Sequence, residues 1–428
     1  MTKETGQSSY ALMRSGRGFK LMLASLLVLI GLALYAYSRQ FVEGLAVTGM
    51  RDIGTVGGSA WGLYIIFDIY FVGVSFAGIT VAALVRLFKL EHLRPISRMA
   101  ELLTITALVL AALVVVIDLG QPGRGIVNLF RYARPMSPFF GTFSLVISGY
   151  LFASVVYFYL DSRRDAALCA RYPGRWQWLY RLWAAGYKDT AEEKKRHEQT
   201  TWWLALAIVP LLVIAHSTLG LIFGIQGGRP GWFSALQAPA FVILAGVSGM
   251  GLIIIIAAIF RSVPALRERL PLQTFAWLGN FTWVLSVSYL YFVAVELLTG
   301  TYAARQEEAA VTRELLVGNY AWMFWSSAGL ILVSFLILFG QFLRHRYSLP
   351  LMVTAGVLVN IAAIGKRFLL VVPSQTHGSL LPYGAGVYSP TWVEYSIILG
   401  MFALGTLAYA LFARVFPIME IQESEERR

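Results

Sequence analysis

Ten long apolar stretches dominate this chain of 428 residues. A transmembrane helix needs roughly 20 apolar residues, and each stretch meets that length. Only 14% of the residues are charged and the mean hydropathy is +0.65, whereas about a quarter of the residues in a soluble domain are charged. The sequence therefore predicts an all-α integral membrane protein with about ten transmembrane helices, at residues 19–38, 60–85, 97–117, 137–160, 201–223, 238–260, 274–299, 319–343, 349–372 and 391–416.

The lysines and arginines predict how the chain is oriented. Ten spans place both chain ends on one side of the membrane, and most of the 35 lysines and arginines lie in the tails and loops on that side. The positive-inside rule therefore predicts that both termini are cytoplasmic. The net charge of +12 is then a topology signal and does not indicate nucleic-acid binding.

The predicted organisation follows from this topology. The longest loop, at residues 161–200, is expected to be cytoplasmic and partly helical, with an amphipathic segment at the membrane surface around Trp178. The expected parts in chain order are a cytoplasmic tail (1–18), a first span with its outer loop (19–59), a first group of four spans (60–223), a second group of four spans (224–372), an outer loop with the last span (373–416) and a cytoplasmic tail (417–428).

Ionisable residues within the predicted spans are expected to gather toward the outer face of the membrane. Such groups are costly in hydrocarbon and are usually functional. The cytoplasmic halves hold few of them, and Glu101 at a helix entrance is the nearest. The outer group consists of Asp68, Asp118, His216, Glu296, Lys366, Arg367 and Glu394.

Each of these residues also has a purely structural interpretation. Asp118 at a helix end would simply meet interfacial water, and Lys366 would extend its ammonium group toward the interface. Arg367 and Glu296 would form an ion pair between helices, and His216 an interhelical hydrogen bond worth roughly 1 kcal/mol. Structural polarity should be scattered over both leaflets, so the shared depth favours a functional site.

The depth and residue types suit the chemistry of a membrane quinol, which carries two electrons and two protons. A histidine and a carboxylate near the membrane edge provide hydrogen bonds and a proton acceptor. Metal carriers within the chain are not expected, because Cys169 is the single cysteine and His216 is the one histidine predicted inside a span. A redox role would therefore depend on the cofactors of a partner.

Several short runs, taken in order, resemble the polysulfide reductase NrfD family of NrfD/PsrC-like membrane subunits from bacterial respiratory complexes. The similarity extends over about residues 61–416 and is greatest to the ten-span branch, which includes the hydrogenase-2 membrane subunit, DsrP and the alternative complex III subunits. The runs are Trp61 to Leu63 with Phe67 and Asp68, Asp118 to Pro122, His216 with Ser217, Glu296, Arg367, and Tyr388 to Glu394.

The resemblance implies two four-helix bundles with flanking helices, and a quinone pocket in the first bundle near the outer face. Carried over, His216 and Asp118 would bind the quinone head group and relay protons, with Asp68 as a second acid nearby. The remaining expected pocket residues are Trp61, Arg124 and Ser217.

A proton route in the second bundle has been proposed for some relatives, and the matching residues here would be Glu296, Lys366, Arg367 and, on the adjoining last helix, Glu394. Two departures weaken the case for proton pumping. Lys366 stands where some relatives have an acid, and Phe76 stands where some have a histidine.

The resemblance also implies partners and a location. A ferredoxin-like [4Fe–4S] protein would dock on the outer loops at residues 121–138 and 224–235, with a cytochrome c or a catalytic subunit as a further partner. The chain would lie in the bacterial cytoplasmic (inner) membrane and hold neither haem nor metal.

Two other functions suit parts of the pattern. A proton-coupled secondary transporter would also use interior carboxylates and cations. Transporter sites, however, tend to lie at the bilayer midplane on interrupted helices, and the sequence shows no paired broken helices. A passive membrane anchor would leave the one-sided polar group unexplained. The sequence therefore favours a quinone-interacting subunit.

Overall fold

The computed structural model describes residues 16–51, 58–132, 134, 136–137, 143–171, 173–303, 305–377 and 386–421, and these are almost entirely helical. Ten helical segments in this part of the chain are long and apolar enough to cross a membrane, which confirms the predicted fold class. They are built from α2 (Arg17–Glu43), α3 (Leu63–Val74) with α4 (Phe76–Arg86), α5 (Arg94–Asp118), α7 (Ser144–Ala170), α9 (Ala191–Gly224), α10 (Gln237–Arg261), α12 (Leu272–Leu298), α14 (Ala321–Arg344), α15 (Leu349–Val371) and α17 (Trp392–Val415).

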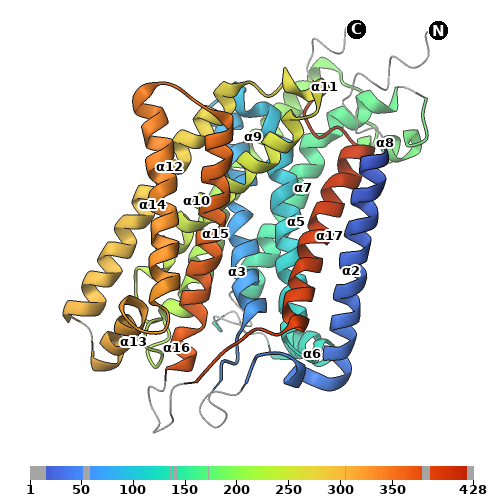
Figure 1. Cartoon of the computed structure of the whole chain (residues 1–428). Helices are drawn as coiled ribbons and strands as arrows, with labels where there is room; N and C mark the ends of the chain where they lie inside the picture. Colours follow the sequence, from blue (N-terminus) through green and yellow to red (C-terminus); the bar gives the residue numbers. More distant parts are fainter. Residues whose placement is uncertain are drawn as a thin grey trace.

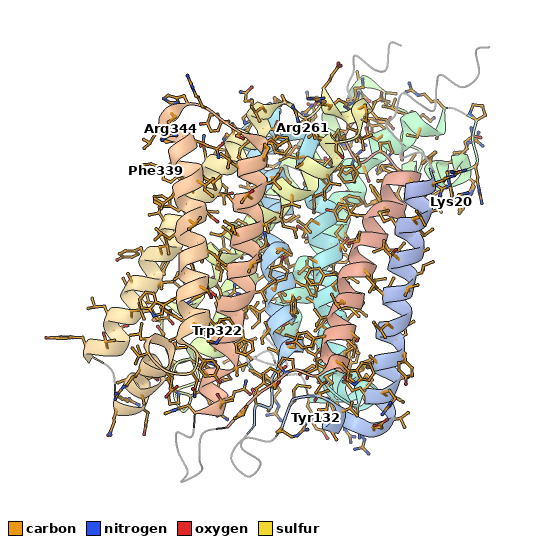
Figure 2. All side chains as sticks on the ribbon, viewed as in Figure 1. Lys20, Tyr132, Arg261, Trp322, Phe339 and Arg344 are labelled. Carbon is orange, nitrogen blue, oxygen red and sulfur yellow. The ribbon has the colours of Figure 1, made fainter. Side chains whose placement is uncertain are left out.

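The two ends of this helical array differ in their short helices (Figure 1). We call the end where α2 begins and α17 ends the terminal end, and it carries α8 (Gln177–Ala184) and α11 (Pro264–Arg267). The opposite, distal end carries α6 (Pro122–Tyr132), α13 (Gln306–Leu316) and α16 (Pro373–Thr376). Figure 2 shows the basic residues Lys20, Arg261 and Arg344 at the terminal end, and Tyr132 and Trp322 at the distal end.

The spans pack as two groups of four. In the first group, α3 and α4 pack on α5, α4 on α9, and α7 on both α5 and α9; in the second, α10, α12, α14 and α15 form a closed ring. The groups meet where α10 packs on α9 and α3, and where α15 packs on α3. A hydrogen bond from the Tyr70 hydroxyl to Asn360 Oδ1, 2.9 Å long, joins them in the interior. The remaining helices, α2 and α17, pack on each other, and α17 also packs on α3 and α5.

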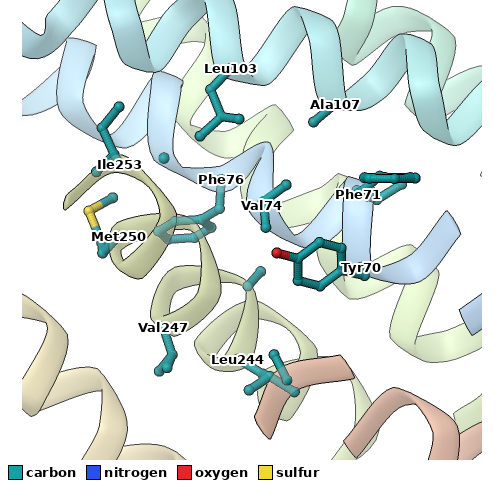
Figure 3. Close-up of a cluster of buried hydrophobic side chains, with 14 of the residues drawn as sticks. Tyr70, Phe71, Val74, Phe76, Leu103, Ala107, Leu244, Val247, Met250 and Ile253 are labelled. Carbon is teal, nitrogen blue, oxygen red and sulfur yellow. The ribbon is translucent and has the colours of Figure 1, made fainter. Parts of the chain in front are cut away.

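The span formed by α3 and α4 lies at the centre of the protein. In its most apolar window 89% of the residues are buried, against 17% for α2. Polar side chains on this span therefore face protein and not lipid. Figure 3 shows the apolar core around it, with Phe76 of α4 lying against α10. The chain approaches its neighbours closely at Gly78, where an added Cβ atom would collide with Thr104 and Ala100 of α5.

Some helices extend beyond the predicted spans. The α7 helix runs from Ser144 to Ala170 instead of over residues 137–160, and α9 begins at Ala191 instead of residue 201. Polar residues continue both helices beyond the apolar stretch, and Thr190 and Glu193 form a capping box at the start of α9. The predicted loop at residues 161–200 is therefore mostly helical, and α8 lies in it as expected.

The early start of α9 places His197 on the same helix as His216, in the polar extension that precedes the apolar stretch. That His216 is the one histidine inside a span stays a prediction. Parts of several predicted regions lie outside the described residues: the tails at 1–15 and 422–428, residues 378–385 of the last outer loop, and residues 133, 135 and 138 of the predicted docking loop.

Candidate functional site

The central span is interrupted at Ser75, between α3 and α4, and this break was not predicted. Backbone carbonyl groups at the break accept hydrogen bonds from other helices. The Ser75 carbonyl accepts from the Thr104 hydroxyl of α5 at 2.5 Å and from the Tyr150 hydroxyl of α7 at 3.1 Å. The Val72 carbonyl lies 3.0 Å from Nε2 of His216 on α9. Ser75 itself keeps right-handed helical angles (φ −62°, ψ −16°), and its amide still donates to the Phe71 carbonyl at 3.2 Å, so the break is a local irregularity in a continuous span.

His216 is buried at this break, with 1% of its surface exposed. Its Nδ1 atom lies 2.8 Å from the Leu212 carbonyl, and its Nε2 atom faces the Val72 carbonyl. A neutral imidazole has one N–H group, so it can donate to only one of these two oxygens. A second proton on the ring would satisfy both. The ring packs edge-on against Phe76 and Tyr150, with centroids 5.6 and 6.1 Å away.

Three carboxyl groups gather at the distal end of the first group of helices: Asp68, Asp118 and Glu394. The charge of Asp118 acts on Asp68, and that of Glu394 acts on Asp118. None of the three forms an ion pair with a described cation. Like charges in a buried site repel each other, and a proton or a hydrogen-bonding ligand would relieve that repulsion.

The three carboxyl groups differ in how they are held. Glu394, fully buried, accepts hydrogen bonds from the Tyr388 hydroxyl at 2.5 Å, the Gly49 amide at 2.6 Å and the Thr391 amide at 3.0 Å. Burial and the Glu394 carboxylate raise the pKa of Tyr388, which keeps its phenol a donor. Asp118, in contrast, has a buried Oδ1 atom without a hydrogen-bond partner among the described residues. Asp118 therefore keeps hydrogen-bonding capacity that Glu394 has already used.

The α3 helix connects the carboxyl groups to His216. Asp68 and Val72 are four residues apart, so they lie on one face of α3, about 6 Å apart along its axis. His216 contacts the Val72 carbonyl, and Asp68 is one turn closer to the distal end. Within the described residues, the contacts of His216 include neither Asp68 nor Asp118 directly. The arrangement is a short polar line from a buried histidine to the distal carboxyl groups.

The other predicted pocket residues are less tightly grouped. Trp61 stacks on Trp232 with centroids 5.6 Å apart, and its amide donates to Gln375 at 3.0 Å. Ser217 is half-buried on α9, and Arg124 is exposed on α6. Their assignment to a quinone pocket stays a prediction.

The four residues of the predicted proton route do not form one group. Glu296, Lys366 and Arg367 line a cavity of about 390 Å³ at the distal end of the second group of helices. Glu394 lies instead with Asp118, at the distal end of the first group. The route stays a prediction, and its expected members occupy two places.

A second charged group, at the terminal end, was missed. Arg86 pairs with Asp161 and also with Glu420 at 3.0 Å, and Arg98 pairs with Asp165 and lies 3.6 Å from Asp161. The expectation that the cytoplasmic halves of the spans hold few ionisable groups did not include this buried network. The network was missed because the predicted helix boundaries placed its residues in loops or at helix entrances. Their spacing of three or four residues along α5 and α7 was the available signal.

This terminal network gives a stability prediction. Arg98 is fully buried, and breaking a buried ion pair typically costs about 3–5 kcal/mol. We expect Arg98→Gln to lower the thermal midpoint and the amount of protein in the membrane. The exposed Arg346→Gln serves as the control and should change neither. A wild-type midpoint for Arg98→Gln would show that the network contributes little.

Ten packed helices with a histidine and carboxyl groups in their interior define a multi-pass membrane protein with an internal polar site. The family model described as "Polysulphide reductase, NrfD" matches residues 52–377. The chain belongs to the NrfD family, as the sequence runs indicated.

Individual relatives extend this finding. A Halobacterium salinarum protein, provisionally named as a membrane subunit of dimethyl sulfoxide reductase, is 30% identical over 94% of this chain and 92% of its own. A selenate reductase subunit of Mesobacillus selenatarsenatis is 26% identical over 88% and 90%. The Hdr-like menaquinol oxidoreductase integral membrane subunit of Archaeoglobus fulgidus is 23% identical over 86% and 87%.

Proposed function

We propose that this chain is the membrane subunit of a respiratory oxidoreductase complex, and that it binds quinone or quinol near the outer membrane face. Relatives named as subunits of reductases and of a menaquinol oxidoreductase support the class. The main support for the quinone site is the polar line from His216, at the helix break, to Asp118, at the distal end. The positive-inside rule predicts that both termini are cytoplasmic, and in this proposal the distal end is therefore the outer face.

The residues have distinct roles in this proposal. Quinol oxidation releases two electrons and two protons, so the site needs proton acceptors that reach water. Asp118, whose Oδ1 atom is unpartnered within the described chain, holds and passes a proton at the distal end. Asp68, on the same face of α3 as Val72, is the acid between Asp118 and His216. His216 exchanges a proton at Nε2 and hydrogen-bonds the head group in the state that binds quinone.

The electrons go to, or come from, a partner subunit. We propose an iron–sulfur protein of the [4Fe–4S] type, docked on the distal loops beside α6 and on the segment after α9. Aromatic side chains gather there, because Trp232 packs on Phe223 with centroids 5.0 Å apart and Phe233 is exposed. The complex would lie in the bacterial inner membrane.

Reduction of the partner tests this function against transport. In the complex purified through this chain, added quinol should produce the electron paramagnetic resonance signal of a reduced iron–sulfur cluster, and a quinone analogue should suppress it. The control is the same complex without quinol. Uphill uptake of a solute by proteoliposomes holding this chain alone, with no quinol-dependent signal, would favour the transporter instead.

A further inference from the structure

The cavity in the second group of helices contains two cationic side chains that form no ion pair with any described residue. We propose that it is a binding site for a phosphate group, carried by a phospholipid or free in solution. The inference is independent of the quinone site and gives Lys366 and Arg367 a role other than the predicted proton route.

The cavity lies between the start of α10, the end of α12 and the distal part of α15, and it measures about 390 Å³. Small-molecule sites usually measure about 300–1,000 Å³. The η4 segment (Thr299–Ala303), α13 and the segment after α9 complete its walls. Exposed wall residues, among them Phe233 and Arg305, show that the cavity reaches the protein surface. A ligand can therefore enter at the level of the lipid head groups.

Arg367 is 5% exposed, and its guanidinium carbon lies 4.0 Å from the centroid of the Phe241 ring. The Lys366 ammonium lies 5.0 Å from the centroid of the Phe324 ring. Aromatic faces hold cations in place by cation–π attraction, but they accept none of the hydrogen bonds that the N–H groups can donate. Both side chains line the cavity.

The hydrogen-bond donors of these two cations have no acceptor in the part of the chain that the structure describes. Among the described residues, neither the Lys366 nor the Arg367 side chain forms an ion pair or a hydrogen bond. Ser374 also lines the cavity, and its buried hydroxyl has no hydrogen-bond partner in the same part of the chain. Buried polar groups are almost always satisfied, and a buried cation without an anion is especially costly. Two cationic side chains that line one cavity and have no anionic partner among the described residues therefore indicate an anionic ligand.

The acidic residues of the cavity do not replace this ligand. Glu308 Oε2 accepts a hydrogen bond from the Gly231 amide at 2.6 Å. Glu296 is exposed at the wall, and its charge acts on Lys366 from beyond ion-pair distance. The lining as a whole contains Arg305, Lys366 and Arg367 against these two carboxylates, so its net charge is positive.

A phosphate group suits these donors better than the alternatives. A neutral quinone would leave both cations unneutralised, and a carboxylate has only two oxygens to offer to both of them. A phosphate presents several oxygens to the planar fork of an arginine and to a lysine at the same time. The cavity is also larger than a phosphate ion, so the group can be part of a larger molecule.

Binding to the purified full-length chain in detergent tests the proposal in two arms. The first adds phosphatidylglycerol and counts bound lipids by native mass spectrometry. The second titrates inorganic phosphate at constant ionic strength and follows the thermal midpoint. The variants are Arg367→Gln and Lys366→Gln, and the control is Arg344→Gln at the terminal end.

We expect wild type to bind in at least one arm, Arg367→Gln to bind about tenfold more weakly or worse, and the control to match wild type. Binding of lipid alone identifies a head group as the source, and binding of both probes identifies phosphate itself. Failure of wild type in both arms, or equal binding by all variants, would overturn the proposal. If Arg367→Gln does not fold, the same binding measurements are made with Lys366→Gln and Arg367→Lys.

Discussion

Replacing His216 with alanine is expected to abolish quinol-linked turnover while the protein remains in the membrane. The substitution removes the imidazole at the break between α3 and α4 and leaves the Val72 carbonyl without this partner. Interhelical hydrogen bonds in membranes contribute only about 0.6–2 kcal/mol, so the helices should still assemble. General acid–base groups contribute about 10²- to 10⁴-fold in rate. Turnover per complex should fall by at least about 100-fold.

A glutamine at the same position separates a chemical role from a structural one. His216→Gln keeps an N–H donor within reach of the Val72 carbonyl but cannot exchange a proton. We expect it to be as inactive as His216→Ala and more stable. The control is His345→Asn, an exposed position at the end of α14 with φ of 49°, which asparagine tolerates. Recovery of turnover in His216→Gln would show that His216 only holds the helices together.

Asp118→Asn is the second substitution with a large expected effect. It replaces one of three neighbouring carboxyl groups with a neutral amide and preserves the size of the side chain. Because the Asp118 Oδ1 atom has no partner to lose among the described residues, we expect unchanged or increased stability. Turnover should fall by about 100-fold or more, since the amide cannot accept the proton. The measurements are the thermal midpoint and the quinol-dependent rate per complex.

Glu394→Gln is the matched comparison, because it changes a neighbouring carboxyl group in the same way. Glu394 belongs to the capping box of α17 and accepts from Tyr388 and Gly49. Glutamine can keep the capping hydrogen bond through its carbonyl oxygen, but its amide nitrogen cannot accept from the Tyr388 hydroxyl, so this variant should lower the thermal midpoint. If Asp118→Asn is destabilised but turns over normally, the roles are reversed: Asp118 would be the structural group and Glu394 the candidate for proton transfer.

The spans were predictable because bilayer thickness imposes the same length on every helix. Asp68 and Asp118 lie in the first group of helices, on α3 and α5. Their association with Glu394 was not foreseen. It depends on how α17 packs against α3 and α5, and the register between helices far apart in the chain is not encoded in local hydropathy.

The break at Ser75 was missed for a related reason. No proline marks it, and the side chains that satisfy its carbonyl groups come from Thr104, Tyr150 and His216, far along the chain. The terminal ion pairs were missed because α7 carries Asp161 and Asp165 past the expected helix end, and because Arg98 was placed at a helix entrance. In both cases tertiary contacts decide the structure of a segment whose local sequence is ambiguous.

The most direct test of the quinone site is binding of a quinone analogue to the purified chain, followed by fluorescence quenching in wild type and in His216→Ala. The iron–sulfur partner is added in a parallel sample. We predict tight binding by wild type that the substitution removes, while the purified His216→Ala protein remains folded. The absence of analogue binding by wild type, with the partner also present, would contradict a quinone site in this chain.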